Sequence, residues 1–390
     1  MAEKRDTHLY VNYGTFQDFF EKSVDWQIRQ REDYEDVGRV FSVYAFAKQP
    51  GEHQLTPKHL ILNVPVLKHP LYAFTSYANF IRVIFRLIGT HEIRHIWMQC
   101  HIYFLPLLIA LRLFQRTCAV GIGLRADLDL AYRLGGPRES EIFLGSRRLA
   151  KCLERMIFKR VCDYVFPRSE NFVPDLVACG VTPGKIVVQR FELPSDFDPG
   201  IDPPSADFLR KFTSVDDPRP VFSFVGRMTR YNFVYDILHL FSKIHKTDPR
   251  ATLIMAGRGP EEEGVRRRVR ELGLEDRVSL PGFVPRESVM KLRKMSDFSL
   301  CLMGGNSLLE AAALGSVVVA YDVDWHTELV THMVNGIVVP EGRVDELFAA
   351  IEEVRRNPEL KVIFAGRSSE IIKEKYSQHR LSIFSRALLN

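Results

Sequence analysis

Residues 221–227, Val-Phe-Ser-Phe-Val-Gly-Arg, and residues 251–257, Ala-Thr-Leu-Ile-Met-Ala-Gly, share the pattern that decides the fold of this part of the chain. Each is a short, almost wholly apolar run that ends in or near glycine. Runs of this kind that alternate with helical segments are typical of parallel strands covered on both faces. A ligand crevice is expected where such strands end, at the carboxyl edge of the sheet.

The same alternation continues through the rest of the second half. We predict strands over residues 221–225, 251–256, 278–280, 297–302 and 317–321, and helices over residues 233–245, 260–272, 286–295 and 307–314. Regular alternation of strands and helices predicts an α/β domain with a parallel sheet.

The first half alternates less regularly. We predict strands over residues 8–13, 39–47, 59–64, 93–101, 119–123, 163–166 and 186–189, and helices over residues 16–30, 81–87, 102–113 and 146–158. Proline, serine and aspartate concentrate between the halves, which is typical of a linker. The predicted organisation is an N-terminal domain over residues 1–200, a linker over 201–219 and a C-terminal ligand-binding domain over 220–375. A final helix over residues 376–390 is predicted to pack back on the first domain.

Length and charge narrow the class of protein. A chain of 390 residues exceeds the ~250–300 residues that one core usually holds, so two domains are expected. The net charge of +5 permits contact with anionic lipid or a phosphorylated substrate but requires neither. No nucleic-acid-binding motif accompanies this mild charge, so nucleic acid is not an expected partner.

Cysteine usage and hydropathy predict a cytoplasmic protein. None of the six cysteines forms a CxxC pair, and most lie in apolar runs, as expected for reduced, buried thiols. The N-terminus leads into no apolar signal segment. The most apolar stretch, residues 102–114, is shorter than the ~20 residues that span a bilayer.

Two glycine-containing turns are candidates for chemistry. Gly226-Arg227 follows a predicted strand, and a forked, permanently charged guanidinium at that edge suits a diphosphate. The alternative for Arg227 is an ion pair with a structural carboxylate. Gly257 and Gly259 follow the next strand, where glycine lets the backbone approach another group closely.

The third candidate is residues 304–310, Gly-Gly-Asn-Ser-Leu-Leu-Glu. Its glycines precede a helix start, where first-turn N–H groups and the helix dipole favour an anion. Asn306 or Ser307 is a suitable N-cap. Glu310 lies one turn further and could accept two vicinal hydroxyls of a ribose. The alternative is a capping box between Ser307 and Glu310, which have the S-x-x-E spacing.

Taken in order, these motifs resemble glycosyltransferase family 4, a retaining group with the GT-B fold. The resemblance is carried by Gly226-Arg227, residues 256–259, residues 280–284, residues 306–315, residues 328–330 and residues 335–340. It extends more weakly to residues 163–169 and 180–188. The resemblance implies a GT-B-like α/β protein: two Rossmann-like parallel-sheet domains facing a central cleft. The first domain would bind the acceptor and the second a nucleotide sugar.

The resemblance also implies roles for single residues. Gly226 and Arg227 would face the donor diphosphate, and Ser307 and Leu308 would offer it backbone N–H groups. The nucleobase would lie beside Phe283 and Val284, and the ribose hydroxyls on Glu310. With their neighbours, the predicted donor-binding residues are Gly226, Arg227, Arg230, Asn232, Gly257, Phe283, Val284, Gly305, Asn306, Ser307, Leu308 and Glu310.

The chain departs from the family at three places. Asn232 stands where a lysine is usual, although Arg230 is close enough in sequence to supply the cation. Leu302 replaces the first glutamate of an E-x7-E pattern, which contacts the transferred sugar. Arg125 stands where a histidine is frequent; it could bind phosphate or an acidic acceptor, but it is a poor general base because it stays protonated.

Catalytic candidates follow from these departures. Asp127 and Asp129 could replace the missing base, with solvation at the surface as the alternative. The predicted catalytic residues are Arg227, Arg125 and Asp127. We expect no cofactor and no metal, because arginine and helix dipoles can stabilise a departing diphosphate. His91, His95 and His101 have spacings that do not reliably place them on one face, so they are not expected to bind metal.

Residues 79–89 are both basic and strongly apolar. Together with the basic segment 147–160 they could form a membrane-facing surface for a lipid-linked acceptor. The alternative is a core helix edged by solvated cations. The chain would then be cytoplasmic, either with or without peripheral contact to the inner face of the membrane.

The sequence therefore predicts a retaining glycosyltransferase. It would move a sugar from a nucleotide diphosphate sugar to a glycan or lipid-linked acceptor hydroxyl, in cell-surface polysaccharide or glycolipid synthesis. The rival hypothesis is a binding or scaffolding protein that kept the fold and lost catalysis, to which Leu302, Asn232 and Arg125 all point.

Overall fold

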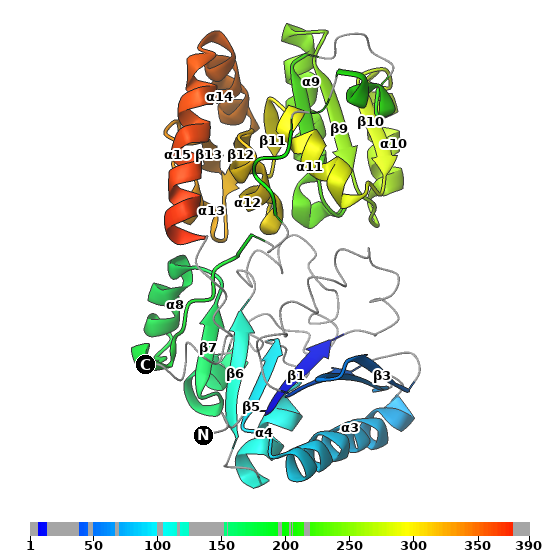
Figure 1. Cartoon of the computed structure of the whole chain (residues 1–390), viewed down its shortest axis with the longest axis vertical. Coiled ribbons are helices and arrows are strands. Elements are labelled where there is room, and N and C mark those ends of the chain that lie inside the picture. Colours follow the sequence, from blue (N-terminus) through cyan, green and yellow to red (C-terminus); the bar gives the residue numbers. More distant parts are fainter. Residues whose placement is uncertain are drawn as a thin grey trace. The chain divides into compact units, whose positions relative to one another are not determined.

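Both halves of the chain are built around largely parallel sheets (Figure 1). The structure is a computed structural model that describes residues 7–13, 39–45, 50–66, 70–99, 104–114, 118–124, 152–153, 155–193, 197–202, 204, 206–213 and 219–376. The described residues form two compact units, of which the first ends at Gln189 and the second begins at Arg190.

The sheet of the second unit has six parallel strands in the order β10-β9-β8-β11-β12-β13. The strands are β8 (Val221–Val225), β9 (Thr252–Ala256), β10 (Val278–Gly282), β11 (Phe298–Leu300), β12 (Val317–Asp322) and β13 (Ile337–Pro340). The chain builds outward from β8 to β10 and then returns to the other side of β8 to form β11. In open sheets of this kind, ligands bind outside the carboxyl ends at that point of reversal.

Helices cover both faces of this sheet because successive strand residues point to opposite sides. Leu253 and Met255 of β9 belong to the core formed with α9, α10 and α14, whereas Ile254 and Ala256 pack with α11 on the other side. Helices α12 and α15 also pack on this second side, around Val318 of β12. The helices are α9 (Val234–Thr247), α10 (Glu262–Glu271), α11 (Arg286–Met295), α12 (Asn306–Ala313), α13 (His326–Leu329), α14 (Val344–Arg356) and α15 (Glu359–Lys375).

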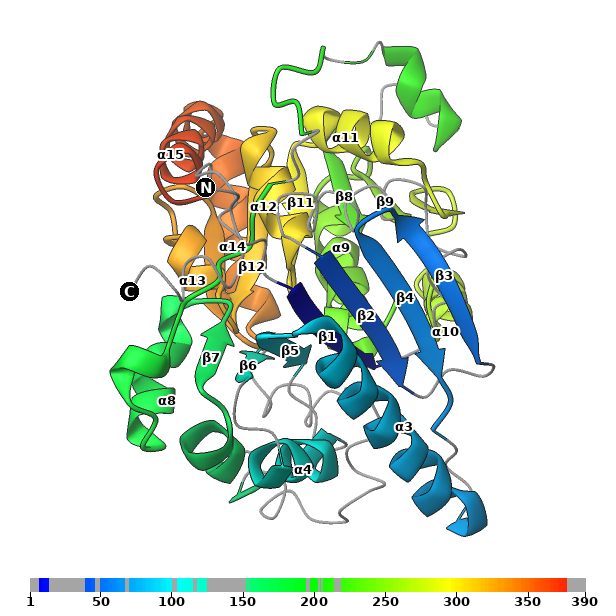
Figure 2. The ribbon, with the colours of Figure 1, turned by 60° about the horizontal axis from the view of Figure 1, so that its bottom comes forward.

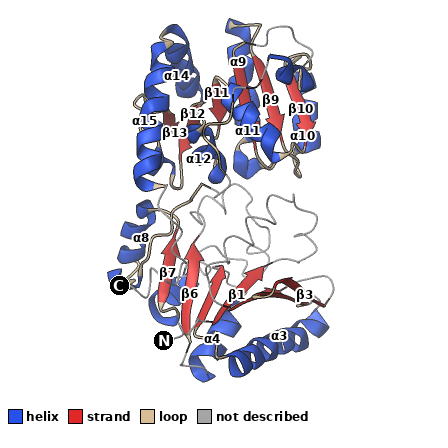
Figure 3. Ribbon diagram, in the orientation of Figure 1, coloured by secondary structure: helices blue, strands red, loops and turns tan. Residues whose placement is uncertain are grey.

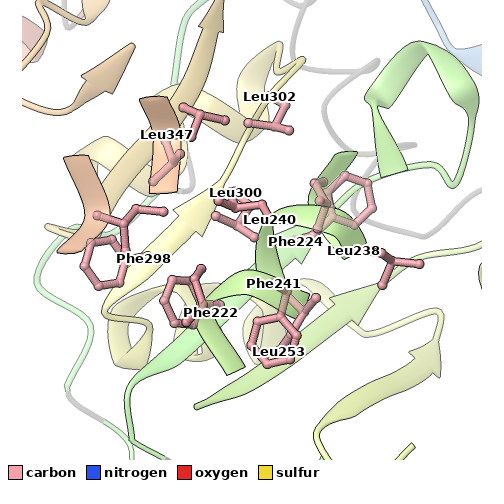
Figure 4. Packing of buried hydrophobic residues seen from close by; sticks show 14 of the residues in the cluster. Phe222, Phe224, Leu238, Leu240, Phe241, Leu253, Phe298, Leu300, Leu302 and Leu347 are labelled. Atoms are coloured by element: carbon pink, nitrogen blue, oxygen red, sulfur yellow. The ribbon is translucent and has the colours of Figure 1, made fainter. Parts of the chain in front are cut away.

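Aromatic side chains hold β8 and β11 together at the point of reversal (Figure 4). The rings of Phe222 on β8 and Phe298 on β11 stack with centroids 5.0 Å apart, and Phe241 of α9 meets Phe222 edge-on at 5.9 Å. All three side chains are fully buried. Burying one such side chain contributes about 1.5–3 kcal/mol, so this junction is a rigid base for the loops that leave the two strands.

The first unit contains a seven-stranded sheet in the order β3-β4-β2-β1-β5-β6-β7 (Figures 2 and 3). Only β3 is antiparallel, because two turn residues separate it from β4 and a parallel pair would need a long crossover. The elements are β1 (Thr7–Tyr13), β2 (Arg39–Ala45), β3 (Gly51–Thr56), β4 (His59–Val64), α3 (Pro70–His91), β5 (His95–Gln99), α4 (Leu105–Phe114), β6 (Ala119–Leu124), β7 (Tyr164–Pro167) and α8 (Val173–Ala178). None of the described helices is long and apolar enough to cross a membrane.

The predicted α/β fold and all predicted strands of the second unit are confirmed, but one strand of the first unit is wrong. Residues 186–189 form no strand: Ile186 makes only an isolated bridge with Val165, and Gln189 donates one backbone hydrogen bond to Pro167. The segment touches β7 and then leaves the sheet. The predicted helix over residues 16–30, the one over residues 376–390 apart from Tyr376, and most of the one over residues 146–158 lie outside the described residues.

Part of the segment predicted to be a linker packs on the second unit. The short 3-10 helix Ala206–Lys211 buries Phe208 and Leu209 against Ile254 of β9 and Leu292 of α11. Upstream of it, the Phe191 ring packs at a tilt against Trp325, with ring centroids 4.8 Å apart. The second unit therefore includes chain well before β8.

Candidate functional site

The carboxyl end of β8 carries Gly226 and Arg227 to the point of reversal in the sheet. The Gly226 N–H donates to the Ala256 carbonyl at the end of β9, at 3.0 Å. Arg227 is exposed, and no ion pair between described residues includes its guanidinium. The structural ion pair considered for Arg227 is thus not formed within the described part of the chain, and the charge stands at the edge where a ligand is expected.

The main chain that follows β9 approaches the main chain that follows β8 so closely that two of its residues must be glycine. Gly257 has a φ of +137° and donates its N–H to the Gly282 carbonyl at 2.7 Å. A Cβ atom at residue 257 would lie 1.9 Å from the Gly226 carbonyl oxygen, and one at Gly259 would lie 2.2 Å from that of Met228. A side chain fits at neither position, so this loop rests directly on the end of β8.

Asn232 and Arg230 shape the loop that contains Arg227. The Asn232 side-chain amide donates to the Arg227 carbonyl, and its backbone N–H donates to the Thr229 hydroxyl at 3.2 Å. The guanidinium of Arg230 lies 3.3 Å from the Glu261 carboxylate. Because Arg230 remains exposed, such a pair is weak and does not prevent it from meeting an anion.

Phe283 and Val284, predicted beside a nucleobase, have different environments. The Phe283 side chain is 61% exposed, whereas Val284 is buried in the core that includes Leu292 and Ile254. An exposed aromatic ring at the end of β10 offers a face for stacking. The side chain of Val284 serves the packing of the loop, so only its backbone is left to meet a ligand.

Helix α12 begins without a side-chain cap. Gly305 is the N-cap and Asn306 the first helical residue, so the prediction that Asn306 or Ser307 caps the helix is wrong. Ser307 instead donates its hydroxyl to the Val225 carbonyl of β8 at 2.6 Å. The Leu308 N–H donates to the Gly305 carbonyl at 3.1 Å, whereas the N–H groups of Gly305, Asn306 and Ser307 have no acceptor among the described residues. These three amides form the kind of helix start that binds anions.

Glu310 is a buried carboxylate held between two arginines of α11. Only 5% of Glu310 is exposed; Oε1 lies 3.3 Å from Nη1 of Arg286, and Oε2 accepts from Nη1 of Arg293. Arg293 also donates to the Ser307 hydroxyl at 2.8 Å. The capping-box alternative is thereby excluded, because Glu310 pairs with α11 instead of reaching back to the N-cap.

This network links the predicted donor-binding residues to one another. It runs from the Val225 carbonyl through Ser307 and Arg293 to Glu310 and Arg286. A carboxylate offers roughly four lone-pair sites, so Glu310 can accept ribose hydroxyls while it keeps both arginines. The arginines fix its orientation in advance, which reduces the conformational entropy lost when a ligand binds.

Four residues of this region were not predicted from the sequence: Arg286, Arg293, Trp325 and His326. The two arginines lie seven residues apart, a spacing that places both on one face of α11 and could have suggested a shared partner. Trp325 and His326 lie at the start of α13, and both are almost fully buried beside the turn that precedes α12. Nothing in their spacing predicts that contact.

The departures from the family pattern have different outcomes. Leu302 is fully buried in the main core of the second unit, together with Phe224, so its side chain packs in the protein interior (Figure 4). Arg125, Asp127 and Asp129 lie outside the described residues.

The histidines considered for metal binding pack in the first unit. The His91 ring lies 4.4 Å from the Phe41 ring, and His95 stacks on His8 at 5.2 Å. His101 lies outside the described residues. Within the described part of the chain, no three His, Cys, Asp or Glu side chains are grouped so that they could hold a metal ion.

Comparisons with known proteins identify the second unit. Residues 205–370 match the family model described as "Glycosyl transferases group 1". A relative from Streptomyces kanamyceticus, alpha-D-kanosaminyltransferase, is 27% identical over 173 residues, which are 43% of this chain and 45% of that protein. The chain thus matches about half the length of such curated relatives.

Solved structures extend the likeness to the whole chain. Sucrose-phosphate synthase from Thermosynechococcus elongatus superimposes with a TM-score of 0.73 at 15% identity, covering 99% of this chain and 97% of the other. Anabaena HepE in complex with UDP and glucose gives a TM-score of 0.70 at 16% identity, covering 98% of each chain. The chain therefore has a GT-B-like fold, and residues 205–370 of its second unit match the glycosyl transferases group 1 family.

Proposed function

We propose that this chain transfers a sugar from a nucleotide diphosphate sugar to an acceptor hydroxyl, with retention at the anomeric carbon. The observation that carries the proposal is the convergence of three groups at one edge of the second sheet. Arg227, the amides that start α12 and the carboxylate of Glu310 all adjoin the ends of β8 and β11. Family membership of this domain supports the same reading.

In this mechanism the main demand is to stabilise the departing diphosphate. The bond between the anomeric carbon and the diphosphate oxygen breaks, and the acceptor oxygen bonds to that carbon from the same face. The proton of the acceptor hydroxyl would pass to Asp127, the base predicted from the sequence. Arg227 and the first-turn amides of α12 would meet the charge that develops on the leaving group. Glu310 would hold the ribose, and the exposed ring of Phe283 would support the base.

The remaining parts of the proposal rest on the sequence resemblance. Arg125 and Asp127 would act at the acceptor side of the reaction, and no metal or other cofactor would be needed. Turnover that survives full chelation by EDTA would support the metal-free mechanism, whereas activity that returns only with added Mg²⁺ or Mn²⁺ would contradict it.

A purified-protein assay with a panel of UDP and GDP sugars tests the donor site. Arg227→Ala should lower kcat/KM about 10²–10³-fold, as for loss of one group that stabilises a developing charge. The matched control is Arg250→Ala, because Arg250 is also an exposed arginine but lies at the amino end of β9, and its loss should leave turnover unchanged. NMR of the product's anomeric centre would show whether configuration is retained.

Three outcomes separate the hypotheses. Transfer by the wild type that Arg227→Ala removes supports the enzyme. Binding of a nucleoside diphosphate without turnover of any donor supports a binding protein that kept the fold. If no nucleoside diphosphate binds, both ligand hypotheses are wrong.

We also propose that a lipid-linked or glycan acceptor is met at a membrane surface, in synthesis of a cell-surface polysaccharide or glycolipid. The helix α4 is apolar on both sides: Leu108 is buried, whereas Ile109, Leu113 and Phe114 are 44%, 64% and 76% exposed. Phe80 of α3 stacks on Phe104, just before α4, with ring centroids 6.0 Å apart.

Charge supports the same surface. Neither α3 nor α4 contains an aspartate or glutamate, and α3 exposes Arg82 and Arg86 one turn apart. The π-helix Ile157–Val161, which packs against α4, adds exposed Lys159 and Arg160. The half-exposed carboxylate of Asp163 is paired with Arg112 of α4 at 2.8 Å. Exposed apolar side chains beside cations suit the headgroup region of an anionic membrane.

A further inference from the structure

The N–H and the carbonyl of Gly304 both bond to the two residues that begin α13. The Gly304 N–H lies 3.0 Å from Nε2 of His326, and the Gly304 carbonyl accepts from Nε1 of Trp325 at 2.9 Å. His326 is 0% exposed and Trp325 is 1% exposed. Gly304 immediately precedes the N-cap of α12, so this pair of bonds acts on the turn that leads into the three first-turn amides.

The surroundings of His326 assign its tautomer. Nδ1 lies 2.8 Å from the Tyr321 carbonyl, whereas Nε2 lies 3.0 Å from both the N–H and the carbonyl of Gly304. The Gly304 carbonyl already accepts from Trp325, and a hydrogen on Nε2 would leave the Gly304 N–H without an acceptor. A hydrogen on Nδ1 satisfies both the Tyr321 carbonyl and the Gly304 N–H, so we assign it there. Burial lowers the pKa of His326 despite opposing contributions from the Tyr321 and Gly304 backbone and from the charge of Asp322. The ring is therefore neutral, and the bare Nε2 accepts the Gly304 N–H.

The neighbouring residue is confined as well. A Cβ atom at Gly305 would lie 3.3 Å from the Phe191 ring, and Phe191 in turn packs at a tilt against Trp325, with ring centroids 4.8 Å apart. The turn is thus enclosed by Trp325, His326 and Phe191. Precise placement of the amides matters, because a donor that is displaced by about 1 Å loses much of its effect on a developing charge.

We propose that His326 is a positioning residue for the donor diphosphate. Its Nδ1-protonated ring fixes the Gly304 peptide and thereby aims the N–H groups of Gly305, Asn306 and Ser307. This inference rests on the proposed donor site: His326 itself is fully buried and acts only through the turn.

Two conservative variants of His326 test its hydrogen bond to Tyr321 and its hydrogen bond to Gly304 separately. In His326→Asn the amide takes the place of Nδ1, so it can still donate to Tyr321 but cannot reach Gly304. In His326→Gln the amide oxygen takes the place of Nε2 and can accept the Gly304 N–H. The matched control is His239→Asn, because His239 is exposed on α9.

Titration calorimetry of the full chain with UDP and GDP, and with uridine and guanosine, provides the test. His326→Asn should weaken binding of the diphosphate about tenfold, as for loss of one buried hydrogen bond, while His326→Gln should stay within about threefold of wild type. Binding of the nucleosides should not change in either variant. Hydrogen exchange should show a less protected Gly304 amide in His326→Asn only.

Other results would overturn the inference. It is wrong if His326→Asn binds the diphosphate as tightly as wild type, or if the Asn and Gln variants lose the same affinity. Should His326→Asn not fold, Trp325→Phe, which removes the donor to the Gly304 carbonyl together with part of the indole ring, must show the selective loss of diphosphate binding. A wild-type chain that binds neither UDP nor GDP overturns the proposed function itself, although hydrogen exchange at Gly304 still reports whether His326 holds the turn.

Discussion

Arg293 is a charged residue that is buried and hydrogen-bonded to two residues of the candidate site. Its side chain is only 4% exposed, and it donates both to Glu310 and to the Ser307 hydroxyl. A buried ion pair adds little net stability when it is compared with an apolar pair, but removal of one partner leaves an uncompensated charge. Arg293 therefore supports the site by keeping Glu310 and the start of α12 in register.

Replacement of Arg293 by methionine should destabilise the second unit by about 3 kcal/mol. This is the lower end of the range for a broken buried pair, because Glu310 keeps Arg286 as a partner. Urea unfolding would measure the change. The control, Arg250→Met at the surface, should shift stability by less than about 0.5 kcal/mol. Equal effects of the two substitutions would contradict the proposed role of the network.

At the scale of single residues, the motif predicted Glu310 but not its partners. Glu310 belongs to a local pattern of helix start and carboxylate that can be recognised without a structure. Arg286 and Arg293 come from another helix, 24 and 17 residues earlier in the chain, and their approach depends on how α11 and α12 pack. The same holds for His326, whose contact with Gly304 joins segments that follow different strands.

At the scale of elements, buried strands were predicted better than polar ones. The runs that became β8 and β9 are apolar and end in or near glycine, which is a strong local signal. Strand β3 has the sequence GEHQLT and an exposed edge, so its pattern contains no sign of burial. Residues 186–189 have the opposite property: their apolar composition suggests a strand, yet the segment is leaving the sheet.

Strand β4 should make the stability of the first unit sensitive to pH. His59 is buried, its Nε2 lies 2.8 Å from the Ser42 hydroxyl of β2, and burial lowers its pKa from 6.5 to about 4. Below pH 6.5 His59 becomes protonated in the unfolded chain but stays neutral in the folded chain. Stability is thus fully present above pH 6.5 and is lost as pH falls toward 4, by up to about 3 kcal/mol.

Urea unfolding at pH 7.5 and pH 4.5 would measure this loss. His59→Leu should unfold with a smaller difference between the two pH values than wild type. His53→Leu on β3, where the side chain is exposed, is the matched control and should retain the wild-type difference. An unchanged pH dependence in His59→Leu would show that other groups dominate acid unfolding.

At the scale of the whole molecule, the proposed membrane surface predicts that binding to anionic membranes depends on the positive charges of α3. Vesicles of phosphatidylcholine with and without phosphatidylglycerol provide the measurement. Arg82→Glu combined with Arg86→Glu should lower binding to the anionic vesicles at least about tenfold, since each basic residue near such a surface contributes about 1 kcal/mol. Binding should also fall as salt is raised.

The matched control reverses two exposed arginines of the second unit. Arg267→Glu with Arg270→Glu on α10 changes the net charge equally but leaves α3 and α4 untouched. If this control loses as much binding as the α3 variant, the attraction depends on net charge alone. If neither loses any, the apolar face of α4 does not act as a membrane surface.

The loop after β9 has a further consequence for how this protein can diverge. Gly257 and Gly259 are pressed against carbonyl oxygens and admit no side chain, whereas Arg258 between them is exposed. Of these three residues, only Arg258 can therefore be substituted without displacing the backbone. Substitution of Arg258 can change the charge at this edge of the sheet, and with it the preference among phosphorylated ligands. The backbone that supports Gly226 and Arg227 keeps its conformation.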